Sequence, residues 1–322
     1  MKNNFLSLCF FLCFITMTTA QIRIGNFYIA GKHKKLSKKT VEKFKNTTTY
    51  FIFNEDNKNY TRSDYKTLLD EVWTFTPYEI IEEKDMYDIF KPGVAFARFI
   101  SFSITRFGKY GASTSSYHVI DFSVIKKITK DKVKKGKRIF QWKDDRVAAI
   151  YFTPDISSRQ QIVSGKDSIS GNLMNYKLGY IKNYFQFINS SLEKKESFNM
   201  FDDSIDKEKI GELKNKTLYI SENFIYSYSP HKIDEKDEQM TPEKLFEDYQ
   251  YSYKVISDEE LNNKILNNED FYYLMYNQNV SVKVYSIVNG KTGDIIFSKY
   301  KSMSYNLKPK NLKEISKKIS KN

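Results

Sequence analysis

The side chains that most often carry out catalysis are few and scattered in this sequence. Its 322 residues include three histidines, His33, His118 and His231, and no His-x-x-x-His or Glu-x-x-His spacing of the kind that binds zinc. His118 follows a tyrosine in a β-rich run, where we expect a packed or edge residue of a strand rather than a general base. The sequence has neither a Gly-x-Ser-x-Gly elbow nor a phosphate-binding loop. It therefore predicts no catalytic residue, no metal site and no cofactor.

Carboxylates occur in adjacent pairs, at positions 82–83, 144–145 and 202–203. General acid–base catalysis needs two carboxylates at a defined separation in a cleft, whereas adjacent residues on a strand point to opposite faces. The start of an acidic helix explains the first pair, and exposed turns explain the other two. A hydrolase that uses carboxylates such as Glu82 or Asp144 remains an alternative hypothesis, which requires two of them across a deep pocket.

The most distinctive charged segment is residues 126–138, in which Asp131 is the only carboxylate. Its cations are Lys126, Lys127, Lys130, Lys132, Lys134, Lys135, Lys137 and Arg138. This density of charge cannot be buried in a core, and it suits a polyanion such as an acidic glycan, lipopolysaccharide phosphates or nucleic acid, of which we expect nucleic acid least. A solvated basic loop with no partner explains the pattern equally well. The flanking Phe122, Phe140 and Trp142 are expected to pack within the hairpin.

An internal repeat indicates how this segment is positioned. Residues 37–50 (SKKTVEKFKNTTTY) align with residues 206–219 (DKEKIGELKNKTLY) at a constant offset of 169. Three further pairs of blocks follow in the same order: 68–81 with 245–256, 82–90 with 257–265, and 133–140 with 290–297. The preserved order favours a duplication, in which each copy is one packing unit. The basic segment occurs only in the first copy, and compositional bias would affect both copies alike.

Each copy contains the same series of predicted elements: a short capped helix, a strand, a second helix, a second strand, a short acidic helix, antiparallel strands and a terminal helix. The antiparallel strands are expected at 98–104, 117–128, 137–142 and 146–152 in the first copy, and at 271–276, 281–288 and 294–300 in the second. The terminal helices are expected at 172–192 and 309–320. The sequence thus predicts an α/β (α+β) fold of two tandem homologous modules, 21–200 and 201–322. Each module is a mixed sheet with an antiparallel meander covered by helices.

The first twenty residues resemble an export signal rather than a part of the fold. A positive start precedes an apolar run at residues 5–15, and small residues precede a cleavage site before position 21. The run is shorter than the 17 to 25 residues, roughly, that span a bilayer. Cys9 and Cys13 lie inside this segment, so the mature chain is expected to contain no disulfide. We expect a periplasmic or extracellular protein, and its net charge of +13 favours anionic partners.

The order of elements also resembles a known superfamily. A strand of the type YEIIEE (78–83) or YKVISD (253–258), a short acidic helix and a strand pair that turns at NGKTGDIIF (289–297) are similar to an envelope α/β domain superfamily. That superfamily includes the amino-terminal domain of the Tol-system propeller protein and the curli-secretion lipoprotein. This chain differs in having no glycine before YEIIEE, no lipobox and no propeller repeats. The resemblance implies contact with, or assembly of, envelope components without catalysis.

Together these observations predict an exported, non-enzymatic interaction or assembly protein of the bacterial cell envelope. Its expected partner is an envelope protein or an anionic polymer, and any membrane contact is expected to be peripheral. The alternative is a module that binds an anionic glycan or nucleic acid through residues 126–138.

Overall fold

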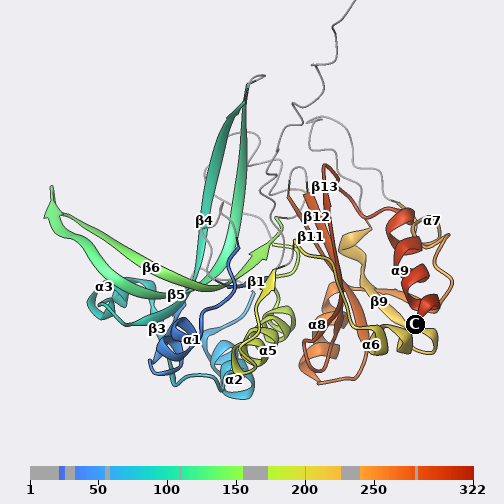
Figure 1. Ribbon diagram of the computed structural model, residues 1–322, viewed down its shortest axis with the longest axis horizontal. Coiled ribbons are helices and arrows are strands. Elements are labelled where there is room, and N and C mark those ends of the chain that lie inside the picture. Colours follow the sequence, from blue (N-terminus) through green and yellow to red (C-terminus); the bar gives the residue numbers. More distant parts are fainter. Residues whose placement is uncertain are drawn as a thin grey trace, which may run out of the picture.

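The computed structural model describes residues 22–25, 33–54, 59–108, 111–154, 173–199, 201–225, 240–279 and 282–322. Within these ranges two mixed sheets lie on either side of a long helix, α5 (Leu178–Glu193), as Figure 1 shows. The predicted α/β class is confirmed. The predicted export signal lies outside the described residues. Among the described helices, none is long and apolar enough to cross a membrane.

Sheet 1 has the strand order β3-β2-β4-β5-β6-β1-β7. Its strands are β1 (Ile22–Ile24), β2 (Thr49–Phe53), β3 (Tyr78–Glu82), β4 (Ala95–Gly108), β5 (Gly111–Lys134), β6 (Lys137–Phe152) and β7 (Phe198–Asn199). β3, β2 and β4 run parallel, and the remaining pairs are antiparallel. The accompanying helices are α1 (Lys38–Lys45), α2 (Arg62–Val72), η1 (Glu83–Asp85) and α3 (Met86–Ile89).

Sheet 2 has the order β10-β9-β11-β12-β13-β8. Its strands are β8 (Ser204–Ile205), β9 (Leu218–Ser221), β10 (Tyr253–Ile256), β11 (Tyr272–Asn279), β12 (Val282–Asn289) and β13 (Ile295–Ser302). Again the first two pairs are parallel and the rest antiparallel. The helices are α6 (Lys207–Gly211), η2 (Glu212–Lys214), η3 (Glu222–Phe224), α7 (Pro242–Leu245), α8 (Asp258–Leu266) and α9 (Pro309–Lys321).

Five strands of each sheet correspond in order, direction and register. Thr49 and Leu218, which are 169 positions apart as in the sequence alignment, are each the first residue of a strand that pairs in parallel with two neighbours. Each sheet also has a bulge at the corresponding place, with Val147 left without a cross-strand partner in one and Ile296 in the other. Bulges are kept within protein families because they set the local bend of a strand. The shared bulge supports the predicted duplication, which stays a proposal about origin.

The register corrects one block of that alignment. Counted from the shared bulge, Ala148 of β6 corresponds to Phe297 of β13, so the predicted match of Phe140 with Phe297 is wrong. The error arose because both segments contain a turn glycine followed by a strand. Residues 125–144 form an addition that the second copy replaces with the short turn 290–293.

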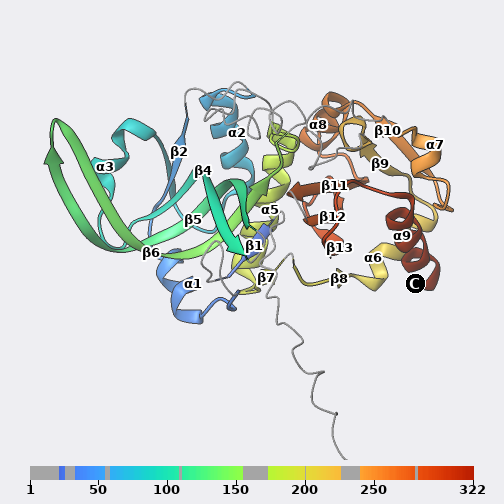
Figure 2. The ribbon, with the colours of Figure 1, turned by 90° about the horizontal axis from the view of Figure 1, so that it is seen from above.

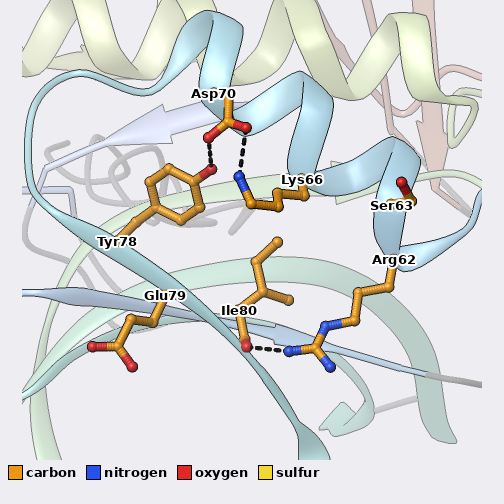
Figure 3. Close-up of a pocket in the computed structure, with 7 residues that line it drawn as sticks. All are labelled: Arg62, Ser63, Lys66, Asp70, Tyr78, Glu79 and Ile80. Atoms are coloured by element: carbon orange, nitrogen blue, oxygen red, sulfur yellow. Dashed lines mark hydrogen bonds and ion pairs between the residues drawn. The ribbon is translucent and has the colours of Figure 1, made fainter.

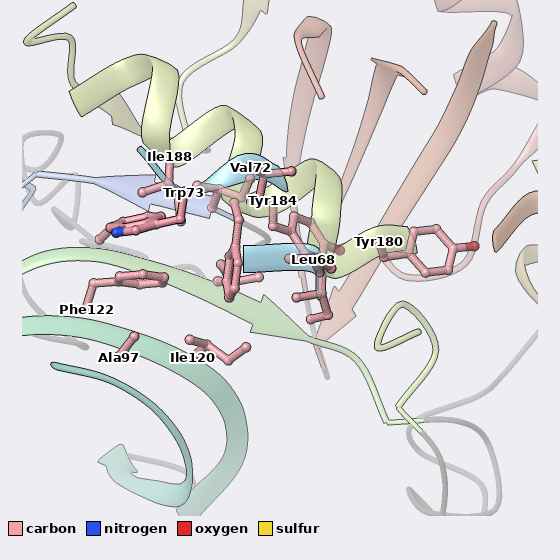
Figure 4. Packing of buried hydrophobic residues seen from close by; sticks show 14 of the residues in the cluster. Leu68, Val72, Trp73, Ala97, Ile120, Phe122, Tyr180, Tyr184 and Ile188 are labelled. Carbon is pink, nitrogen blue, oxygen red and sulfur yellow. The ribbon is translucent and has the colours of Figure 1, made fainter. Parts of the chain in front are cut away.

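Helix α5 is buried on two sides, and this joins the two halves into one core. On one side Phe185 contacts Phe51 and Phe122 of sheet 1, with ring centroids 5.5 and 5.7 Å apart. On the other side Tyr180 lies 6.0 Å from Tyr273 of sheet 2. Figure 4 shows Trp73, Phe122 and Ile188 packed together while Tyr180 points the other way. The proposed boundary at position 200 therefore separates two sheets but not two isolated cores.

A second core lies on the far face of sheet 2. There α9 places Leu312, Ile315 and Ile319 against the sheet, and all three are fully buried. The outward face of α9 carries exposed lysines.

Candidate polyanion-binding surface on the β5–β6 ribbon

Beyond sheet 1, β5 and β6 continue as a two-stranded ribbon that projects away from the second half of the molecule (Figures 1 and 2). The strands stay paired up to Lys134 and Lys137. Lys135 and Gly136 form the turn with φ of 51° and 72°, as a two-residue type I′ turn requires. The sequence predicted a long basic loop here. The structure instead has regular strand, because alternating β-branched and lysine side chains suit a ribbon with two different faces.

The inner face of the ribbon is aromatic and packs on α3. Phe140 lies 5.3 Å from the ring of Tyr87, and Trp142 lies 5.3 Å from Phe90. Phe96 of β4 completes this apolar cluster. The prediction that Phe140 and Trp142 are packing residues is confirmed, and their burial fixes which face of the ribbon looks outward.

Arg138 belongs to this inner face and is already engaged. Its Nε and Nη2 donate to the two carboxylate oxygens of Asp131, both at 3.0 Å, and Nη1 donates to Asp88 at 3.1 Å. Hydrogen bonds from Arg138 lower the pKa of Asp131 below its usual value. The charge of Arg138 is therefore satisfied within the protein and directed away from the outer face.

The outer face gathers lysines from both strands. The register places Lys127 opposite Lys143, Lys130 opposite Gln141, and Lys132 opposite Ile139. Residues directly opposite each other point to the same side of a sheet. Lys134 follows by alternation. We call this surface the lysine face: Lys127, Lys130, Lys132, Lys134 and Lys143.

Two bulges produce this grouping. In an uninterrupted strand Lys127 and Lys130 would point to opposite faces, because side chains alternate with a period of two. The register shifts between Ile128 and Lys130, which leaves Thr129 without a cross-strand partner and brings both lysines to one side. A second shift leaves Lys126 at a bulge, where its ammonium lies 2.6 Å from Asp145.

The lysine face has no counter-charge of its own. Within the described residues, none of its five side chains forms a hydrogen bond or an ion pair. Four of them are exposed and Lys130 is half-buried. The pair of Lys127 and Lys143 sets like charges directly across the ribbon, which is destabilising. Packing within the protein explains the residue types of the inner face, but it does not explain why five lysines gather on the outer face.

The eight predicted binding residues therefore divide by position. Lys127, Lys130, Lys132 and Lys134 belong to the lysine face, Lys135 is the exposed first turn residue, Lys126 pairs with Asp145, Lys137 is the first residue of β6, and Arg138 is on the inner face. Lys143 was missed, because the predicted strand ended at Trp142 with a turn at 144–145. That turn is wrong: Asp144 lies inside β6 and accepts a 3.1 Å hydrogen bond from Nε1 of Trp142. Alternation continued through positions 139, 141 and 143 would have found Lys143.

The carboxylates named for the hydrolase alternative lie in separate places. Glu82 ends β3 and contacts Lys84. Asp144 is half-buried on β6, and its pKa is raised, first by burial and then by the nearby Asp121. Asp121 is itself buried and forms an ion pair with Arg146. Asp121, Asp144 and Arg146 thus form a charged cluster on a sheet face, apart from Glu82, rather than an acid and a base across a pocket.

An open groove of about 630 Å³ lies between α2 and β3 (Figure 3). Its floor is Ile80, whose carbonyl accepts a 2.7 Å hydrogen bond from Arg62. Asp70 on its rim accepts from Lys66 at 2.6 Å and from the hydroxyl of Tyr78, and these bonds lower its pKa. Neither Glu82 nor Asp144 lines this groove. Asp70 is bonded to Lys66 and Tyr78, and the other carboxylate of the groove, Glu79, points away from Asp70 in Figure 3.

His118 is a packed strand residue, as predicted. It is buried, its Nδ1 lies 2.8 Å from Oγ of Ser101, and burial lowers its pKa to about 4. No group of three His, Cys, Asp or Glu side chains among the described residues is placed to hold a metal ion.

No protein-family model, curated protein or solved structure matches this chain. The resemblance to the envelope superfamily thus remains a prediction from the sequence pattern.

Proposed function

We propose that the protein is an exported, non-enzymatic interaction protein of the bacterial cell envelope, and that its lysine face binds an anionic partner. One observation carries the proposal: five lysines from two strands share one face, and none is neutralised by a described residue. The apolar run at residues 5–15 supports export. The ion-paired carboxylates and the buried His118 support a role without catalysis.

Binding by this face is electrostatic. Lysines that neutralise the charges of a polyanion release its counterions, so affinity falls steeply as salt is added. Lysine supplies a flexible point charge, whereas arginine supplies a rigid fork for one planar anion. A row of lysines therefore suits a partner whose anionic groups are repeated rather than fixed in one geometry.

Nucleic acid is the less favoured anionic partner. Proteins that bind single strands combine a basic groove with aromatic rings on which the bases stack. Here the rings of Phe140 and Trp142 pack against α3 on the opposite side of the ribbon. The lysine face offers charge without a stacking surface.

The test is elution from heparin with a salt gradient. A variant with all five lysines of the lysine face changed to glutamine is compared with a matched control on the exposed side of α9. The control changes Lys310, Lys313, Lys317, Lys318 and Lys321 to glutamine, and these side chains are also exposed. Both variants lose five charges; they differ in where the charge was and in the ion pair between Lys313 and Asp248, which only the control loses.

We expect the lysine-face variant to elute at much lower salt than the wild type and the α9 variant to elute near it. The proposal is contradicted if the lysine-face variant elutes at the same salt concentration as the wild type, or if the elution of both variants shifts equally. Equal shifts would show that net charge alone governs retention.

A further inference from the structure

We infer that the partner of the lysine face is the surface of an anionic lipid bilayer. This inference rests on the proposed function, because it names the kind of anion that the same five lysines meet. It is carried by the shape of the ribbon, by the side chains between the lysines, and by the contrast between the two copies of the hairpin.

The lysine face is the outer side of a curved, two-stranded ribbon (Figure 2). From Lys127 to Lys134 it extends about 24 Å along the strand, and it is two strands, about 5 Å, wide. The described grooves lie elsewhere, one between α2 and β3 and a smaller one beside α5 and α6. A polymer chain is normally held in a groove that follows its backbone. An open array of lysines outside these grooves matches an extended anionic surface.

The packed inner face of the ribbon excludes a second mode of binding, insertion into a groove of DNA. A two-stranded ribbon can enter the major groove of double-stranded DNA, which is about 12 Å wide. This ribbon is packed against α3 as far as Arg138, close to the turn, through the contact with Asp88. Its inner side is therefore attached to the body of the protein, and only the outer face is available to a partner.

The side chains among the lysines suit a lipid interface. Ile139 lies between them on the lysine face, opposite Lys132. The lysine face contains no carboxylate, because Asp131 is held on the inner side by Arg138. Lysine stems can lie along apolar surface while the ammonium groups reach the headgroups. The result is a peripheral contact, not an insertion.

In the second copy the corresponding hairpin end packs against another element of the fold. There the short turn docks on α5: the side-chain amide of Asn183 donates to the carbonyl of Gly290 at 2.9 Å, and Gln186 donates to Lys291 at 3.0 Å. In the first copy the same hairpin is lengthened, and its contacts with Asp88, Tyr87 and Phe90 lie on the inner side. A hairpin end that serves contact in one half is thus free for an external contact in the other.

The experiment is co-sedimentation of the protein with lipid vesicles at low ionic strength. Vesicles that mix anionic phosphatidylglycerol with zwitterionic phosphatidylcholine are compared with vesicles of phosphatidylcholine alone. A basic side chain near an anionic surface changes partitioning about fivefold, so changing the five lysines to glutamine should lower partitioning more than about a hundredfold. The corresponding five-arginine variant should bind like the wild type, as should the α9 control. High salt should release the protein.

Two results would overturn the inference. One is failure of the wild type to bind anionic vesicles although its retention on heparin depends on the lysine face, in which case the proposed function stands and the anion is a free polymer. The other is vesicle binding that the glutamine variant retains in full. If neither heparin nor vesicles depend on the lysine face, the proposed function fails as well. Urea unfolding followed by tryptophan fluorescence checks that each variant is folded.

Discussion

Two lysines, Lys182 and Lys283, are fully buried, and their surroundings differ. Lys182 on α5 lies 2.7 Å from a carboxylate oxygen of Glu71 and so has a counter-charge. Lys283 on β12 donates only to neutral oxygens, the side chain of Asn311 at 2.6 Å and the carbonyl of Asn306. Burial, and to a smaller extent nearby lysines, lower the pKa of Lys283 to about 7. Its ammonium form is therefore held at a cost to stability.

This cost should appear as a pH dependence. The unfolded chain holds the Lys283 proton up to its usual pKa of about 10.4, and the folded chain loses it near pH 7. Because the unfolded state binds more protons between these values, the free energy of unfolding should rise with pH in this range. Relative to Lys283→Met, the wild type should gain about 2–3 kcal/mol between pH 7 and 9.5. Urea unfolding at both pH values measures this gain. The prediction is wrong if the difference in the free energy of unfolding between the two proteins is the same at both pH values.

The like-charged pair across the ribbon gives a second test at this scale. Lys143→Glu would set a carboxylate opposite Lys127 and convert repulsion into attraction. We expect the free energy of unfolding to rise by about 0.5 kcal/mol, an increase that 1 M salt removes. Retention on heparin should fall at the same time. Lys143→Gln is the control and should give a smaller gain. A loss of stability in Lys143→Glu would mean that the two side chains do not face each other.

At the scale of elements, the contact between α5 and α8 depends on a glycine. The backbone N–H of Gly179 donates to the side chain of Asn262 at 2.8 Å. A Cβ at position 179 would lie 2.8 Å from the backbone carbonyl of Asn262 and 3.2 Å from Cβ of Ile265. The close approach of the two helices therefore leaves no room for a side chain.

Gly179→Ala tests whether packing or helix propensity decides at this position. Alanine is the better helix former by about 1 kcal/mol, but overpacking costs about 1–3 kcal/mol. We expect a net loss of stability, measured as a lower urea midpoint. Ser190→Ala, later in the same helix, is the control and should leave the midpoint nearly unchanged. A more stable Gly179→Ala protein would show that the helices move apart easily.

At the scale of the whole molecule, the burial of α5 on both sides couples the two sheets. Both tryptophans, Trp73 and Trp142, belong to the first half, so their fluorescence reports on sheet 1 alone. Leu312 is fully buried in the second core, under α9. A coupled molecule should unfold as one unit even when only the second half is weakened.

Leu312→Ala tests this coupling. The change should cost about 2–5 kcal/mol and lower the urea midpoint seen by tryptophan fluorescence, although the substitution lies in the other half. Circular dichroism in the far ultraviolet should give the same midpoint. An early transition by circular dichroism with unchanged fluorescence would mean that the halves are independent.

The sequence by itself determined the order of the capped helices and the longer strands, but not the short strands β1, β7 and β8 or the continuity of β6. Ser37, Asp206 and Thr241 cap helices as their types predict, and the terminal helix expected at 309–320 is α9. These features could be predicted because caps and hydrophobic periodicity are local properties of the chain. The density of lysine at 126–138 likewise indicated that this segment lies outside the core.

Only the tertiary structure decided which way the lysines point and what α5 touches. The grouping of Lys127 with Lys130 depends on the bulge at Thr129, next to the segment where Trp142 packs on Phe90. A strand's period of two contains no information on where such a bulge occurs. Similarly, Lys182 lies on a helix that looks amphipathic, yet it is buried because Glu71 of α2 supplies a counter-charge. Both outcomes depend on contacts between residues far apart in the sequence, which local patterns do not encode.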